Sequence, residues 1–118
     1  MRNLEVSLFN ALGPVVAGRV HPVVVPQDAT FPCIRYALAS GTRPASLCGD
    51  AGLMYSDVQI DIYAREFSEV RALREQVITA MQGFPLAATN TMELDAFEAD
   101  VKMFRRMLQY SIAEQEGP

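Results

Sequence analysis

The chain has 118 residues, of which 50% are hydrophobic, and a formal net charge of −4. This length is sufficient for one domain with its own hydrophobic core, which does not need disulfide bonds or metal ions for stability. An acidic chain does not favour broad phosphate contacts, and no apolar run is long enough to span a bilayer. The two cysteines, Cys33 and Cys48, have no metal-ligand or redox spacing, which favours a reduced intracellular protein.

The first half of the chain predicts a helix followed by extended segments. Leu4, Leu8 and Leu12 recur at helical spacing, so residues 3–12 are expected to form a short amphipathic helix. The β-branched segment 19–26 contains two prolines, which confine it to a sheet edge or an extended strap.

Two strands are expected next, joined by a long loop. Apolar and polar residues alternate over 33–40 and 54–64, and both segments are expected to be strands of one antiparallel hairpin. The stretch between them, GTRPASLCGDAG at 41–52, is rich in Gly, Pro and small residues and predicts a flexible loop.

The second half begins with the strongest helical pattern of the chain, over 67–82, which Gly83 and Pro85 should end. Strands are expected over 89–97 and 103–112, followed by a frayed tail at 113–118. The order α-β-β-β-α-β-β predicts one α+β domain over 1–118. Its sheet should be mostly antiparallel, with two helices packed on one face.

No catalytic, cofactor or metal constellation is evident in the sequence. His21 is the single histidine and is expected on the surface of an edge strand. Asp57 and Asp61 share a strand face roughly 13 Å apart, too far for a carboxylate pair, so a solvated face is expected. Cys48 would need a nearby base to act as a nucleophile, and a passive loop thiol is the simpler interpretation.

Arg105 and Arg106, considered without their sequence neighbours, would suggest a site for nucleic acid. Four carboxylates lie near them in the sequence, and no further basic residues cluster around them. We therefore expect no nucleic-acid site at this pair.

Several runs of sequence, taken in order, resemble one known family. They are GRVHP at 18–22, VPQ at 25–27, FPCIRY at 31–36, VQIDIYA at 58–64, VRAL at 70–73 and FRRMLQYSI at 104–112. Together they resemble the small tail-completion proteins of long-tailed bacteriophages and prophages, over nearly the whole chain.

This resemblance implies a tail-terminator or head–tail joining protein without catalysis or cofactors. Members of such families are similar in forming a ring, typically six-fold, at the head-proximal end of the tail tube. The expected partners are other copies of the chain, the tail tube protein and the head–tail connector, with no membrane and no sequence-specific nucleic acid. The expected locations are the host cytoplasm during assembly and then the virion.

Interface residues are expected in the long loop and on the hairpin that carries it. They are Arg43, Leu47, Asp50, Gln59 and Asp61. Alanine changes in the loop and hairpin should impair assembly and leave folding intact.

Two other classes of function remain open from the sequence. One is a small-ligand or regulatory module, in which the face with Gln59, Asp61 and Tyr63 lines a pocket. The other is a small enzyme, which the missing catalytic constellation disfavours.

Overall fold

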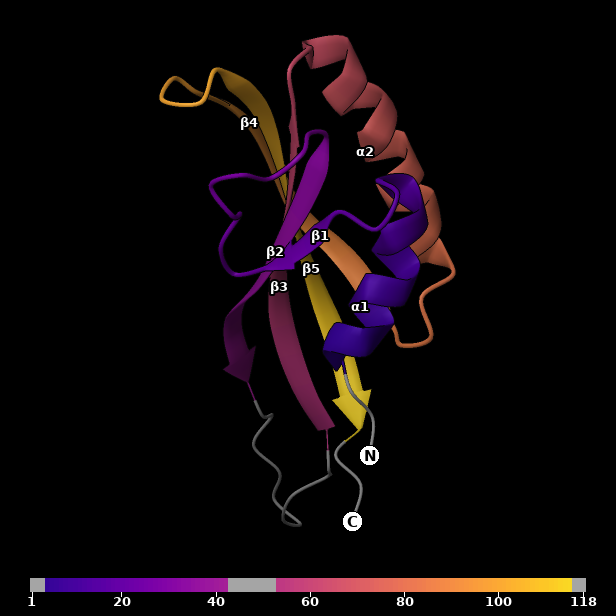
Figure 1. Ribbon diagram of the computed structural model, residues 1–118. Helices are drawn as coiled ribbons and strands as arrows, with labels where there is room; N and C mark the ends of the chain where they lie inside the picture. The colour runs from indigo at the N-terminus through magenta and orange to yellow at the C-terminus, as the bar shows by residue number, and fades with distance from the viewer. Residues whose placement is uncertain (1–3, 43–52, 116–118) are drawn as a thin grey trace.

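The computed structural model describes residues 4–42 and 53–115 and arranges them as two helices against one sheet (Figure 1). The elements in chain order are α1 (Leu4–Leu12), the 3-10 turn η1 (Gly13–Val15), β1 (Val20–Pro22), β2 (Cys33–Thr42), β3 (Leu53–Ala64), α2 (Phe67–Gln82), β4 (Ala88–Glu98) and β5 (Met103–Gln115). This order confirms the predicted α-β-β-β-α-β-β succession and the α+β class.

The sheet has the strand order β1-β2-β3-β5-β4. Strands β2 and β3 form the expected antiparallel hairpin, and β5 pairs antiparallel with both β3 and β4. Only β1 runs parallel to its neighbour, β2. Helix α2 carries the chain from β3 to the far edge, and β5 then returns between β3 and β4. The two edge strands are therefore β1, with three residues, and β4, with eleven.

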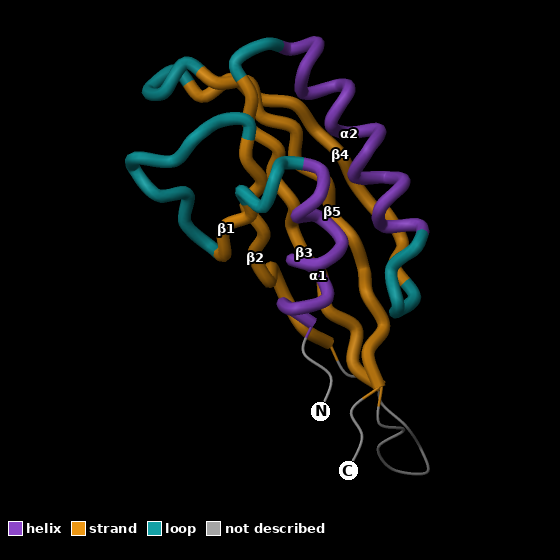
Figure 2. The backbone as a smooth tube through the Cα atoms, turned by 45° about the vertical axis from the view of Figure 1, so that its right-hand side comes forward, coloured by secondary structure: helices purple, strands orange, loops and turns teal. Residues whose placement is uncertain are grey.

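One face of the sheet forms the core with both helices (Figure 2). In β3, Val58, Ile60 and Ile62 alternate with polar residues and are at most 1% exposed, because successive side chains of a strand point to opposite faces. Val70 and Val77 of α2 lie seven residues apart and are fully buried on the helical stripe. The prediction of two helices on one face is confirmed.

Helix α1 packs through its apolar stripe and one polar contact. Leu8 and Leu12 are buried in the core. The hydroxyl of Tyr36 in β2 donates a hydrogen bond to Oε1 of Glu5 at 3.2 Å. Burial, and then the nearby Glu5 carboxylate, raise the pKa of Tyr36, so this hydroxyl stays protonated and can donate.

Two expected boundaries are wrong. Strand β2 continues through Thr42, so the first two residues of the predicted 41–52 loop are extended, and the rest lie outside the described residues. Strand β5 continues through Gln115, because its last residues pair with Leu53–Tyr55, so the predicted fraying is wrong for 113–115. The predicted bounds of α2 are confirmed, although Gly83 follows it at a φ of −93°, without the left-handed conformation typical of glycine caps.

Two strands also differ from expectation in what they bury. Met92 and Leu94 share a face as predicted, but that face points away from the helices and both side chains are exposed. Leu38 alternates with Ile34 and Tyr36, yet it is exposed where a bulge interrupts β2.

Removal of a core side chain should destabilise the fold far more than removal of an edge side chain. Leu108 in β5 is fully buried within the core, and Leu108→Ala should lower the free energy of unfolding by about 2–5 kcal/mol. The matched change Leu94→Ala, on exposed β4, should cost less than about 1 kcal/mol. Urea unfolding followed by circular dichroism measures both, and equal losses would place the core elsewhere.

Candidate assembly surfaces

The face of the sheet away from the helices carries a charged cluster at its centre. In the strand register, Asp61 of β3 lies opposite Arg35 of β2 on one side and Met107 of β5 on the other. Arg105 lies two residues from Met107 on the same face of β5. Three neighbouring strands therefore bring one carboxylate and two guanidinium groups together.

Asp61 is fully buried in this cluster. Its Oδ1 accepts a hydrogen bond from Arg105 Nε at 2.9 Å, and its Oδ2 accepts one from Gln59 Nε2 at 3.0 Å. Arg35 Nε lies 3.6 Å from Oδ2, and Arg105 also donates from Nη1 to Glu98 at 3.1 Å. The expectation of a solvated strand face is wrong at Asp61, since two arginines take the place of water.

The cluster keeps Arg105 firmly charged. Burial acts to lower the pKa of Arg105, but the hydrogen bond to Asp61 and the charge of that carboxylate raise it overall. Tyr63, on the same face, has a raised pKa because of its burial and then because of the charge on Asp61.

The predicted interface residues are placed as follows. Gln59 is half-buried and its amide is bonded to Asp61. Asp61 has no exposed surface, so in the isolated chain it reaches a partner only through the arginines that it holds. Arg43, Leu47 and Asp50 lie outside the described residues, as does Cys48. Their role at an interface stays a prediction.

A groove of about 440 Å³ lies beside this cluster. The loop after β1 forms one wall, with Val24 and Phe31, and the β4–β5 turn forms another, with Val101. Tyr63 and Arg35 line it, and the buried Nε of Arg35 has no hydrogen-bond partner among the described residues. Of the residues in the predicted ligand pocket, only Tyr63 reaches this groove, because Asp61 and Gln59 lie outside its lining.

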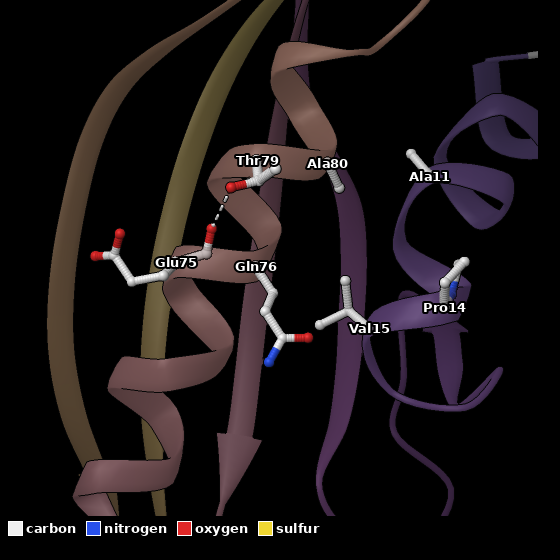
Figure 3. A pocket seen from close by; sticks show the side chains of 7 residues that line it. All are labelled: Ala11, Pro14, Val15, Glu75, Gln76, Thr79 and Ala80. Atoms are coloured by element: carbon white, nitrogen blue, oxygen red, sulfur yellow. Dashed lines mark hydrogen bonds between the residues drawn. The ribbon is translucent and has the colours of Figure 1, made fainter.

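A second groove, of about 390 Å³, separates the two helices (Figure 3). Its lining is Ala11, Pro14, Val15, Glu75, Gln76, Thr79 and Ala80. The Thr79 hydroxyl is bonded to the carbonyl of Glu75 within α2. Small side chains and few convergent polar groups make this a seam between helices, which differs from the usual lining of a ligand site.

On the helix side, ion pairs hold edge strand β4 in place. Arg74 of α2 makes a two-point contact with Glu93, with N–O distances of 2.9 and 2.7 Å. Arg106 pairs with Asp95 and approaches Glu93 at 3.4 Å. The hydrogen bond from Arg74 lowers the pKa of Glu93 more than burial raises it. Thus Arg105 and Arg106 point to opposite faces, and each is paired with carboxylates of the chain itself.

Exposed apolar side chains gather at the two edges of the sheet. At the β1–β2 edge Leu38 is exposed, and at the β4 edge Met92, Leu94 and Phe97 are exposed, whereas the exposed Val23, Val24 and Val101 line the groove described above. Val23 has a φ of 64°, a left-handed conformation that is strained for a β-branched residue. Apolar residues grouped in this way are typical of contact surfaces.

The remaining reactive groups of the described residues lie apart from one another. Burial raises the pKa of the Cys33 thiol to about 11, so this cysteine is unreactive at neutral pH. His21 lies on edge strand β1 as expected, but it is only partly exposed, and its buried Nε2 has no hydrogen-bond partner among the described residues. Within residues 4–42 and 53–115, no three potential metal ligands come together, and no helix there is long and apolar enough to cross a membrane.

A family model described as tail completion protein gp17 matches residues 7–115. The chain therefore belongs to this family of phage tail proteins, and the resemblance seen in the sequence is confirmed.

Solved structures match the fold as well. They include a chain of a structure titled "Virion of native gene transfer agent (GTA) particle", with a TM-score of 0.73 and 14% identity over 97% of this chain and 95% of that one. At this identity the likeness establishes a shared fold. No curated protein matches the sequence.

Neutralising Asp61 should destabilise the fold strongly. Asp61→Asn leaves Arg105 and Arg35 without their central counter-charge, and the free energy of unfolding should fall by about 2–4 kcal/mol. The estimate is below that of a fully enclosed pair because the Arg105 side chain is 21% exposed. The matched change Asp95→Asn, at a carboxylate that is 44% exposed, should cost about 0–1 kcal/mol. Urea unfolding at pH 7 compares them, and an equally mild Asp61→Asn would contradict the central role of the cluster.

Acid should release the tie between α2 and β4. The folded pKa of Glu93 lies below its usual value of 4.5, so its contribution to stability is present above that pH and is lost as the pH falls through the lowered pKa. Glu93→Gln should therefore lose less stability than the parent between pH 5 and pH 3, roughly the range of carboxyl titration. Arg74→Gln should have the same effect, because Arg74 is the main cause of the shift. Urea unfolding across this range tests both, and unchanged pH profiles would refute the assignment.

Proposed function

We propose that this chain forms a ring at the head-proximal end of the tail tube and joins the tail to the head. The family assignment supports a role in tail completion. The shared fold with a chain from a phage-like virion particle supports assembly with other virion proteins. The proposed partners are further copies of the chain, the tail tube protein and the head–tail connector.

The observation that carries the ring is the presence of two different apolar surfaces on opposite edges of one sheet. Leu38 lies near one edge and Phe97 on the other, with β3 and β5 between them. When one surface of a copy binds a different surface of the next, the assembly closes into a ring if the rotation allows it. We propose six copies in the ring, the number that the resemblance to tail-completion proteins implies.

The acidic balance of the chain suits a passage for DNA. With a net charge of −4, the chain repels phosphates on average, and Arg105 and Arg106 are occupied by internal carboxylates. DNA would then move through the ring without being retained. The location follows as the host cytoplasm during assembly and then the virion. Arg43, Leu47, Asp50 and Gln59 are proposed to contact neighbouring copies or tail partners.

Deleting the gene from its phage or prophage tests the function directly. After induction, negative-stain images should show separated heads and tails, or tails of uncontrolled length, and infectious titre should fall by several orders of magnitude. The type of defect distinguishes joining from termination.

A matched control supplies the wild-type chain in trans, which should restore the titre. Normal infectious particles from the deletion strain would refute the proposal. Attention would then turn to the groove beside Arg35 and Tyr63, with a thermal-shift screen of metabolites.

A further inference from the structure

The two edges of the sheet are complementary in backbone, charge and apolar contacts. Resting on the ring proposed above, we infer that β4 of one copy pairs with the uncovered half of β2 in the next copy. The sheet would then continue across each subunit boundary by strand addition.

Among the described residues, no strand lies beside the second half of β2 on its outer side. Strand β1 pairs only with Ile34, Arg35 and Tyr36. Ile34 donates its N–H to the Arg19 carbonyl at 2.9 Å, and the Tyr36 carbonyl accepts from Val23 at 2.8 Å. The alternation of an extended strand then directs the N–H and C=O of Leu38 outward. No strand among the described residues pairs there.

Strand β4 presents a longer row of outward groups. The N–H of Ala113 donates to the Ala87 carbonyl at 2.9 Å, which shows which residues of β5 face β4. By alternation these include Met107 and Arg105, opposite Leu94 and Ala96. In β4, the residues that alternate with Leu94 and Ala96 therefore direct their N–H and C=O groups outward, past the edge of the sheet. They are Glu93, Asp95 and Phe97.

The charges of the two edges favour pairing of β4 with β2 over pairing of β4 with a second β4. Strand β4 carries Glu93, Asp95 and Glu98 and no cation, whereas β1 and β2 carry His21 and Arg35 and no carboxylate. Two β4 strands side by side would oppose like charges, which is unfavourable across paired strands. A β4 strand beside β2 meets an edge whose strands carry no carboxylate, so the head-to-tail pairing avoids this repulsion and is preferred over a two-fold one.

Apolar side chains match on the helix side of the same seam. Phe97 lies opposite Phe104 in the register and is 52% exposed. Leu38 lies opposite Val58, also on the helix side, and is 59% exposed. Phe9, 42% exposed, lies one helical turn after the Glu5 that bonds Tyr36 of β2. A continuous sheet places Phe97 of one copy on the same side as Leu38 and Phe9 of the next, where all three become buried.

Cross-linking in assembled tails tests this pairing. The deletion strain is complemented with Leu38→Cys, with Phe97→Cys or with both changes in one chain, each combined with Cys48→Ser. The buried Cys33 is retained as an unreactive thiol. A short bis-maleimide is added to purified particles, and the chain is followed by immunoblot.

The double variant should give a ladder of multimers, while each single variant should stay monomeric. A mixture of the two single variants should give dimers. Phe97→Cys with Tyr55→Cys, a central-strand position that is 40% exposed, is the matched control and should give no ladder.

Dimers from Phe97→Cys alone would show a two-fold contact and overturn the inference. So would particles that assemble and contain the double variant but give no ladder; both results leave the proposed ring standing. If the chain is missing from particles, or its deletion leaves them infectious, the proposed function itself fails and this inference fails with it.

A second measurement uses the sign of the charge. Leu38→Glu and Leu38→Lys remove the same apolar contact. The carboxylates of a neighbouring β4 would repel the charge introduced by Leu38→Glu and attract the charge introduced by Leu38→Lys. Leu38→Glu should lower the titre at least tenfold more than Leu38→Lys, with both purified chains melting within a few degrees of each other. Equal titres for the two variants would overturn the pairing.

Discussion

The carboxylate of Asp61 constrains everything around the centre of the sheet. A charge with no exposed surface is tolerated only when opposite charges and hydrogen bonds replace its water. Here Arg105 and Gln59 bond its two oxygens and Arg35 lies 3.6 Å away, so three strands supply what one side chain needs. A shift of β2 by one residue would turn Arg35 to the other face, together with every apolar side chain of that strand. The cluster and the apolar face of the sheet therefore favour the same register.

The sequence predicted the helices and strands whose hydrophobic repeat lies within one segment. It missed the features that depend on how one strand pairs with another. The stripe through Val70 and Val77 delimits α2, and the alternation around Ile60 identifies β3, because each repeats within its own segment. Asp61 and Arg105 are 44 positions apart, and no periodicity links them. The end of β5 was misjudged for the same reason, since its polar residues gain order only from pairing with β3. The candidate interface followed from the resemblance, and the apolar edges became visible only once the strand order was known.

The long edge strand needs an explanation in physical terms. An unpaired edge of eleven residues invites uncontrolled association, and proteins usually protect such edges with charge, proline or a covering segment. Strand β4 carries three carboxylates, and the short β1 ends at Pro22. The carboxylates of β4 oppose its pairing with a second β4, and Pro22 limits pairing along β1. Pairing of β4 with the second half of β2 is not opposed by either feature. The proposed ring would benefit from this asymmetry, because contacts between unlike edges build it and contacts between like edges lead to aggregates.

A ring made of unlike edges also requires a rigid connection between them. The angle between neighbouring copies equals the angle between the two edges of one sheet, so any looseness in that sheet accumulates around the ring. The Asp61 cluster joins β2, β3 and β5 on one face. The Arg74–Glu93 pair ties β4 to α2 on the other face, and α2 packs on the core. Without these ties the same contacts could continue into an open filament, since closure depends on a fixed rotation. Ion pairs within one subunit would thus help to determine the geometry of the proposed ring.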